Sequence, residues 1–250
     1  MILIYMILFM MGASIFSFLN VVIYRLPLGM NWVNDRSMCP SCKHQLSFMD
    51  MIPIFSWLFL KGKCRYCGAP VSGRYTFVEL LGGISALLCV SVFGFTLKAV
   101  LAFIFISLMT VITFIDIDHM IIPNKLVIAV LIFSLCSFSF FGVSIIEALI
   151  GALCVSLPMY LVTLVIPDGF GGGDIKLMGA AGIFLGWKLT LVATFIAIMT
   201  GGGYGLYLLV TKNADRKSHF AFGPFLCLGM VVALLCGNTL IRWYLGLFGL

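Results

Sequence analysis

Long apolar runs limit the fold of this chain more than any other feature. Hydrophobic residues make up 62% of its 250 residues and charged residues only 10%, whereas soluble domains carry about 25% charged residues. A run of about 20 apolar residues crosses a bilayer as a helix, because a helix satisfies its own backbone polar groups. The sequence therefore predicts an all-α polytopic membrane protein with about eight transmembrane helices. We place these helices at residues 2–24, 77–97, 99–117, 125–141, 145–166, 175–187, 189–210 and 222–245.

The basic residues indicate how the helices are oriented. If residues 25–75 are cytoplasmic, all but three of the 15 Lys and Arg residues fall on the cytoplasmic side, the exceptions being Lys98, Lys188 and Arg242. Cytoplasmic loops carry such an excess, so we expect both termini to lie outside. The formal net charge of +6 follows from this topology and favours contact with anionic lipid headgroups. It does not indicate nucleic-acid binding, because no basic patch is interleaved with aromatic residues.

Two aspartates, Asp116 and Asp174, lie where a membrane makes a carboxylate unfavourable. Asp116 ends an apolar run, and Asp174 follows a glycine cluster at the start of the short sixth predicted span. A carboxylate at membrane depth is disfavoured by several kcal/mol, so it marks a functional site by default. Asp118 is two residues from Asp116 and cannot share its helix face. We therefore expect only one of these two to meet Asp174.

Two carboxylates that converge on one water form an acid/base pair. They do not both ionise easily, so the ionised member accepts a proton from water while the protonated member polarises a scissile carbonyl. The glycines before Asp174 remove side-chain bulk, so that a substrate backbone can approach. These glycines are Gly171, Gly172 and Gly173. The alternative is that the acids cap helices or pair with Lys125 and Lys176.

Residues 25–76 differ from the rest in carrying prolines, polar residues and most of the charge. They include two Cys-x-x-Cys pairs, formed by Cys39, Cys42, Cys64 and Cys67. Each pair can grip one face of a tetrahedral metal ion. Disulfides are the alternative, but a reducing cytosol disfavours them. A segment this short cannot form a stable hydrophobic core without a bound metal or disulfides. The pattern therefore predicts a small four-cysteine, zinc-binding cytoplasmic insertion. The zinc would be structural, because four thiolates leave no open coordination position.

Six motifs follow one another between about residues 12 and 230. They are the run 17–27; the cysteine pairs with Gly62-Lys63; Arg74-Tyr75 with Val78-Glu79-Leu80; Asp116-Ile117-Asp118-His119 with Ile122-Pro123-Asn124; Gly171-Gly172-Gly173-Asp174; and Phe222-Gly223-Pro224-Phe225. In this order they resemble the type IV prepilin peptidase family, the bifunctional prepilin leader peptidases and N-methyltransferases.

The resemblance implies a G-x-G-D aspartyl protease with Asp116 and Asp174 as its catalytic pair. Its substrates would be prepilins and pseudopilins of pilus or protein-secretion systems. It would remove their basic leader at the cytoplasmic face of the bacterial inner membrane. Many members then methylate the new N-terminus with S-adenosylmethionine. Candidate residues for that second activity are Asn20, Arg25, Gly62, Lys63 and Glu79.

We accordingly expect a first transmembrane helix at 1–24, a methyltransferase-associated zinc domain at 25–76 and a multi-helix peptidase domain at 77–250. Phe16, Thr76 and Ala221 depart from the family pattern. Because Phe16 and Thr76 lie beside the parts linked to methylation, a peptidase without methyltransferase activity is the first alternative. A proton-coupled transporter would show repeat symmetry between its halves, which the sequence lacks. A non-enzymatic scaffold would tolerate substitution of the Gly-Asp motif.

Overall fold

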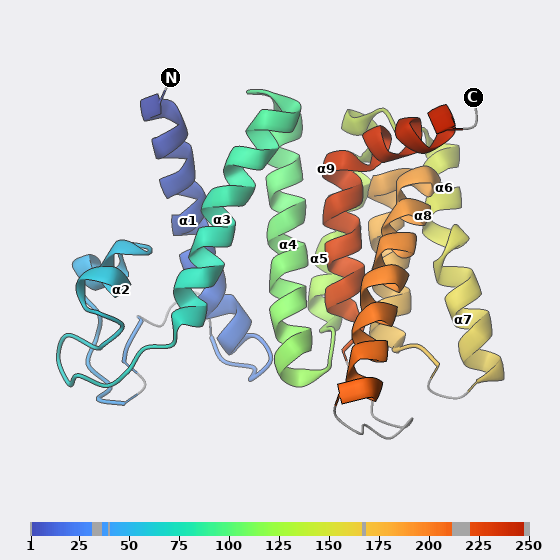
Figure 1. Cartoon of the computed structure of the whole chain (residues 1–250). Coiled ribbons are helices and arrows are strands. Elements are labelled where there is room, and N and C mark those ends of the chain that lie inside the picture. The colour runs from blue at the N-terminus through green and yellow to red at the C-terminus, as the bar shows by residue number, and fades with distance from the viewer. Residues whose placement is uncertain (1, 32–36, 40, 167–168, 212–220, 248–250) are drawn as a thin grey trace. The chain divides into compact units, whose positions relative to one another are not determined.

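The computed structural model describes residues 2–31, 37–39, 41–166, 169–211 and 221–247. Over these residues the chain is helical, and two isolated bridges in the cysteine segment are the only β-type pairing (Figure 1). The chain divides into two compact units, Met1–Phe103 and Ile104–Leu250. The elements are α1 (Ile2–Arg25), η1 (Phe48–Met51), α2 (Phe55–Phe59), α3 (Gly73–Phe93), α4 (Leu97–His119), α5 (Asn124–Ser137), η2 (Phe138–Phe141), α6 (Ile145–Cys154), α7 (Ser156–Val165), α8 (Gly172–Thr211) and α9 (Gly223–Leu247).

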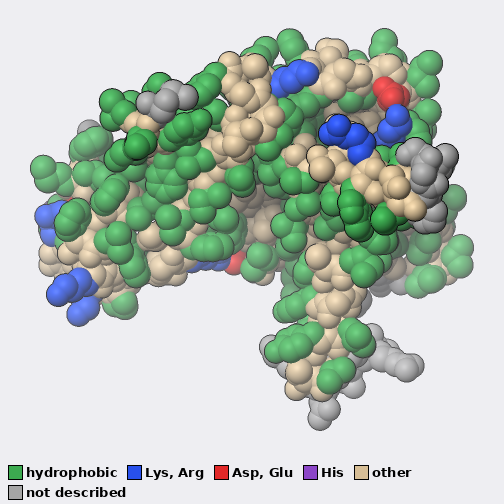
Figure 2. Space-filling model, turned by 45° about the horizontal axis from the view of Figure 1, so that its top comes forward, with side chains coloured by type: hydrophobic (Ala, Val, Ile, Leu, Met, Phe, Trp, Pro, Cys, Tyr) green, Lys and Arg blue, Asp and Glu red, His purple; other side chains and the backbone are tan. Residues whose placement is uncertain are grey.

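The helices match the predicted membrane fold. Seven helices of the described residues are long and apolar enough to cross a membrane, and the face in Figure 2 is mostly hydrophobic, with few charged side chains. They are Ile2–Arg25, Gly73–Phe93, Leu97–His119, Asn124–Phe141, Ile145–Val165, Gly172–Leu208 and Gly223–Leu247. The orientation was predicted from the positions of the Lys and Arg residues. Four of these lie outside the described residues, namely Arg36, Lys212, Arg216 and Lys217.

Helix α8 combines the sixth and seventh predicted spans because the chain folds back within it. Gly186 has non-helical backbone angles (φ 70°, ψ 166°), which glycine adopts without steric cost. A straight helix would separate Asp174 from Gly201 by about 40 Å. Yet a Cβ at Gly223 would lie 3.3 Å from Asp174 Oδ1, and a Cβ at Gly201 would lie 2.8 Å from Phe222. Asp174 and Gly201 therefore both lie beside the start of α9, so the two limbs of α8 run back to the same side.

In the first unit, α1 and α3 pack closely through small residues. A Cβ at Gly82 on α3 would collide with the carbonyl of Gly12 and the ring of Phe16. Small residues allow such close backbone approach between membrane helices. Phe16, one of the departures from the family pattern, is fully buried at this interface and lies 5.7 Å from the ring of Phe103.

In the second unit, aromatic rings and glycines form the core. The ring of Phe184 lies 4.8 Å from Phe105 and 4.8 Å from Phe141. Gly151 of α6 and Gly182 of α8 are in backbone contact, with no room for a Cβ on either. The first half of α8 is thereby fixed against α6, and its second half runs beside α9 (Figure 1).

Candidate active site and metal centre

Asp116 lies in the last turn of α4 and is only 5% exposed. The amide of Met120 donates to the carbonyl of Asp116 (2.8 Å), and Met120 has a φ of 53°. A non-glycine residue in this left-handed region is strained, and such strain clusters at functional sites. Asp118 is exposed, because positions two apart lie on different faces of a helix. The carboxylate directed into the protein is therefore that of Asp116.

Asp174 lies in the first turn of α8 and is 8% exposed. The positive end of the helix dipole favours an acid at this position. The helix begins at Gly172, two residues before Asp174. Asp174 thus lies at a helix N-terminus.

Two contacts dock the glycine segment onto the loop that follows α4. A Cβ at Gly173 would lie 2.9 Å from Cβ of Ile122, and Lys176 Nζ donates to Oδ1 of Asn124 (3.2 Å). The ammonium group of Lys176 therefore binds the side-chain amide of Asn124. Within the described residues, neither Asp116 nor Asp174 forms an ion pair with a lysine.

The two carboxylates meet at Gly223, the first residue of α9. A Cβ there would lie 2.5 Å from Asp116 Oδ2 and 3.3 Å from Asp174 Oδ1. These two oxygens therefore lie within about 6 Å of each other, a range in which carboxylates interact strongly. Oδ1 of Asp174 is buried without a hydrogen-bond partner among the described residues. That oxygen is the one available to a water molecule or a substrate.

The three glycines before Asp174 differ in their surroundings. A Cβ at Gly171 would lie 3.0 Å from Asp174 Oδ2, and Gly173 faces Ile122. Only at Gly172 would an added Cβ meet nothing within 4 Å. Gly171 and Gly173 thus make room for this chain's own atoms, while Gly172 borders open space.

The sequence motif that contains Gly223 had no role assigned to its residues. Its first ring, Phe222, lies 6.1 Å from Phe170, which precedes the glycine cluster. This pair joins the segment before Asp174 to the start of α9. The sequence shows only a Phe-Gly-Pro-Phe run at the start of an apolar helix. The role of Gly223 depends on its contact with Asp116 and Asp174, which are distant in the sequence.

The four cysteines of the insertion come together as a candidate metal centre. Their sulfur atoms all lie within 4.8 Å of one another, and Cys39 Sγ lies 3.9 Å from Cys67 Sγ. Tetrahedral zinc with Zn–S bonds of about 2.3 Å requires sulfurs about 3.8 Å apart. The four sulfurs are therefore close enough together to hold such an ion.

The two cysteine turns repeat one backbone pattern. Lys43 donates its amide to the carbonyl of Cys39 (2.9 Å), as Gly68 does to Cys64 (2.9 Å). Both Lys43 (φ 60°) and Gly68 (φ 70°) are left-handed. Each turn folds the chain so that both of its thiols face the centre.

The charges around the cluster also favour a cation. Hydrogen bonds from the amides of Cys42 and Ser41 lower the pKa of the Cys39 thiol to about 6. At Cys67 the Ala69 amide also favours the thiolate, but burial and the neighbouring cysteines raise the pKa to about 11. Crowded sulfurs thus oppose full ionisation, and a bound divalent cation reverses this effect.

Asp50 ties η1 to the second cysteine turn. Its carboxylate accepts from Arg65 Nε (2.6 Å), Tyr66 Oη (3.2 Å) and both the amide and hydroxyl of Ser47. Burial alone would raise the pKa of Asp50, but these hydrogen bonds hold it at about 2. Asp50 is therefore ionised at neutral pH.

Three residues considered for methyl transfer, Asn20, Arg25 and Glu79, are buried in the first unit. Each is hydrogen-bonded to backbone, so each joins two segments of this unit. The bonds are Asn20 Nδ2 to Tyr75 O (3.1 Å), Arg25 Nη1 to Asn31 O (3.1 Å) and Ile54 N to Glu79 Oε2 (2.7 Å).

The other two, Gly62 and Lys63, precede Cys64. Gly62 is left-handed (φ 69°), and its missing Cβ leaves room for the Trp57 ring, 3.0 Å from where that atom would lie. Trp57 Nε1 in turn donates to the carbonyl of Val71 (3.0 Å). Lys63 is exposed. Gly62 therefore fixes the indole of Trp57, and Lys63 presents its charge to solvent.

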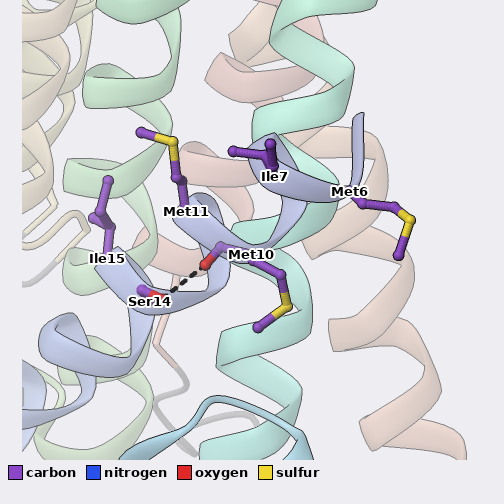
Figure 3. Close-up of a pocket in the computed structure, with 6 residues that line it drawn as sticks. All are labelled: Met6, Ile7, Met10, Met11, Ser14 and Ile15. Atoms are coloured by element: carbon purple, nitrogen blue, oxygen red, sulfur yellow. Dashed lines mark hydrogen bonds between the residues drawn. The ribbon is translucent and has the colours of Figure 1, made fainter. Parts of the chain in front are cut away.

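A shallow hollow of about 520 Å³ lies on the outer face of α1 (Figure 3). The Ser14 hydroxyl in it donates to the carbonyl of Met10 (2.8 Å), so its polar group is satisfied within the helix. The hollow is apolar and open, which suits contact with lipid and not with a polar substrate. Its lining residues are Met6, Ile7, Met10, Met11, Ser14 and Ile15.

The fold and the carboxylate pair define a class of protein, a polytopic membrane protein in which two buried carboxylates meet. Residues 10–93 match the Bacterial Peptidase A24 N-terminal domain, and residues 103–206 match the type IV leader peptidase family. The chain belongs to the type IV leader peptidase family.

Curated relatives agree with this assignment. A prepilin leader peptidase/N-methyltransferase of Aeromonas hydrophila is 34% identical over 95% of this chain and 92% of its own length. A protein of the same name from Bacillus subtilis is 33% identical over 96% of this chain and 97% of its own length. No solved structure matches the chain.

Proposed function

We propose that this protein is a membrane aspartyl endopeptidase that removes the basic leader of type IV prepilins and pseudopilins. The observation that carries the proposal is the meeting of Asp116 and Asp174 at Gly223, in a chain of the type IV leader peptidase family. Within the described residues the pair has no lysine partner, so a purely structural ion-pair role gains no support.

The pair would act by general acid–base catalysis on a water molecule. The ionised carboxylate accepts a proton from water as its oxygen attacks the scissile carbonyl, and the protonated carboxylate donates to the carbonyl oxygen. As the C–N bond breaks, the departing amine takes up the proton that the first carboxylate accepted from water, and a hydroxyl of the tetrahedral intermediate returns a proton to the second carboxylate. The products are the leader, with a new carboxylate, and the mature pilin, with a new amino terminus. Gly171 lies against Asp174 and Gly223 lies against both acids, and Gly172 borders the space that a substrate backbone would enter.

The site would face the cytoplasm from the bacterial inner membrane. The predicted bias of Lys and Arg toward one side supports this orientation, with the cysteine insertion on the same side. A basic leader is retained on the cytoplasmic side by the same rule, while the apolar helix of the prepilin enters the bilayer. The basic leader would thus reach the aspartates without crossing the membrane.

Zn²⁺ is the ion that suits this cluster, because structural zinc sites are commonly formed by two Cys-x-x-Cys pairs. Cys39, Cys42, Cys64 and Cys67 would complete its coordination, so the metal stabilises the insertion and does not bind substrate. Such sites contribute directly to folding free energy.

Methylation of the new N-terminus with S-adenosylmethionine is the proposed second activity. It is supported by the names of the curated relatives. S-adenosylmethionine would supply the methyl group. Asn20, Arg25, Gly62, Lys63 and Glu79 remain the candidates, and four of them hold the first unit together or fix Trp57. A peptidase without this activity is the second candidate function, because Phe16 fills the α1–α3 interface.

The test is cleavage of a tagged prepilin by membranes carrying Asp116→Asn, Asp174→Asn or Asp118→Asn. The first two variants should lose at least about 100-fold in rate, because each lacks one acid/base group. Asp118→Asn is the matched control, an exposed aspartate two residues from Asp116, and should cleave normally. If both buried-aspartate variants cleave at the wild-type rate, the peptidase mechanism is wrong. Incorporation of labelled methyl groups into the cleaved product separates the bifunctional enzyme from the peptidase alone.

A further inference from the structure

The cysteine insertion carries an exposed apolar strip that the proposed function does not use. The strip occupies η1 and α2, and its most exposed members are Phe59 (82%) and Phe48 (81%). Soluble surfaces rarely expose so many large apolar side chains together, and such patches mark interaction sites. The apolar strip consists of Phe48, Met49, Met51, Phe55, Leu58 and Phe59.

A buried hydrogen bond sets the depth of the apolar strip along α3. The amide of Ile54, the residue before α2, donates to Oε2 of Glu79 (2.7 Å). Glu79 lies in the second turn of α3, about 9 Å along its axis from Gly73. The strip is therefore beside the helix and not beyond its end, and Figure 1 shows α2 alongside the lower parts of α1 and α3.

The length of α3 relates this depth to the bilayer. The helix has 21 residues, which gives about 31 Å, close to the thickness of the hydrocarbon core. If α3 spans this core from end to end, its second turn lies about 9 Å inside one face, near the boundary between headgroups and acyl chains. Interfacial segments bury their apolar faces about 5–10 Å into this boundary.

The charges around the apolar strip suit an anionic membrane surface. Lys61 and Lys63, which follow α2, are exposed. Asp50, the acid within the strip segment, has a side chain only 4% exposed and is paired with Arg65 (2.6 Å). The exposed charge next to the strip is therefore positive, and Lys near a membrane is attracted to anionic headgroups.

The surface of α3 near this depth is also apolar. Phe77, Leu80 and Ile84 are exposed on this membrane-spanning helix, where lipid is the surrounding solvent. A lipid environment thus extends to the level of Glu79, and the strip is held at that level by Ile54. This continuity favours lipid over a protein partner.

We propose that the apolar strip is an interfacial membrane anchor, which inserts into the headgroup–acyl boundary and fixes the cysteine insertion against the bilayer. Asp50 links the anchor to the metal centre, because it belongs to η1 and binds Arg65 and Tyr66 of the second cysteine turn. The anchor goes beyond the proposed peptidase activity and does not depend on it.

The experiment measures quenching of tryptophan fluorescence by brominated lipids in the full-length protein. Trp32, Trp187 and Trp243 are replaced with phenylalanine, and Trp57 is kept as a constant background. The reporter is Phe59→Trp, and the matched control is Ser41→Trp, an exposed site on the first cysteine turn. Each variant is reconstituted into phosphatidylglycerol-containing nanodiscs with bromine near the top or the middle of the acyl chain. Phe48→Trp serves as a second reporter, and metal content is checked for each.

The anchor predicts at least twofold stronger quenching of Phe59→Trp than of Ser41→Trp, and stronger quenching by shallow than by deep bromine. Equal quenching of the two variants, or none at either reporter, overturns it. A third outcome also overturns it. The reporters are placed in the Asp116→Asn background, so that an added prepilin stays uncleaved. If the prepilin abolishes the quenching of Phe59→Trp, the strip is a protein-docking surface. Failure of prepilin cleavage has no bearing on any of these readings.

Discussion

Replacing Gly223 with alanine tests how closely α9 holds the two carboxylates. The new Cβ would lie 2.5 Å from Asp116 Oδ2 and 3.1 Å from its Cγ, whereas ordinary contacts begin near 3.4 Å. The carboxylate of Asp116 must therefore withdraw by about 0.9 Å, and a misplacement of about 1 Å lowers catalysis about 100-fold. This corresponds to about 2.7 kcal/mol in kcat/KM. Because only the end of a side chain has to move, the fold should be retained.

The assay is prepilin cleavage in detergent or nanodiscs, with kcat and KM determined separately. The loss should fall mainly in kcat, because Asp116 is proposed to act in the reaction while the rest of the substrate site is unchanged. Gly203→Ala is the matched control, because a Cβ at that helical position meets nothing within 4 Å, and its activity should equal that of the wild type. If Gly223→Ala cleaves within threefold of the wild type, the contact at Gly223 does not position Asp116.

Three further predictions concern the cysteine insertion. Cys39→Ser should reduce bound zinc, measured by elemental analysis, to well below one per chain, whereas Cys136→Ser on α5 should leave it unchanged; equal loss in both would contradict the assignment. Asp50→Asn should make the insertion easier to digest with protease. Because the pKa of Asp50 is about 2, below its usual value, its stabilising pairing with Arg65 is complete above about pH 4 and is lost only as the pH falls toward 2. The difference from wild type should therefore be constant from about pH 5 to 8, and a decline within that range would refute the pairing. Lys43→Gly should relieve a left-handed lysine by about 1 kcal/mol, slowing zinc loss to a chelator about fivefold; faster loss would show that the lysine side chain stabilises the turn.

Hydropathy predicted the membrane helices well because each span has its own apolar run. The errors lie at the ends and at turns. Helix α3 begins at Gly73 and not at 77, since Ser72 caps it by accepting from the amide of Arg74 (3.3 Å). The break between α6 and α7 at Val155 follows from Pro158, which cannot continue the preceding helix. Neither Ser72 nor Pro158 changes the mean hydropathy of the surrounding residues enough to mark a helix end.

The candidate site was only partly predictable. The spacing of Asp116 and Asp118 shows that one of them must point away, but helical phase alone does not say which. The four cysteines carry their own signal, because metal ligands are recognised by local spacing. Gly223 carries none, since its role depends on contact between α4, α8 and α9, which are far apart in the chain. The depth of the apolar strip similarly depends on one hydrogen bond between distant residues, Ile54 and Glu79.

The reversal at Gly186 has a consequence for the membrane around the aspartates. The first limb of α8, residues 172–185, is about 21 Å long, whereas the hydrocarbon core is about 30 Å thick. Such hydrophobic mismatch is relieved by thinning of the bilayer or by burial of the short helix among longer ones. Asp174 lies in the first turn of this limb, at the end opposite Gly186. A locally thinned leaflet would bring water from the headgroup region to a peptide bond that still borders the hydrocarbon. The enzyme would then hydrolyse its substrate at a local depression of the membrane surface and not in the aqueous phase.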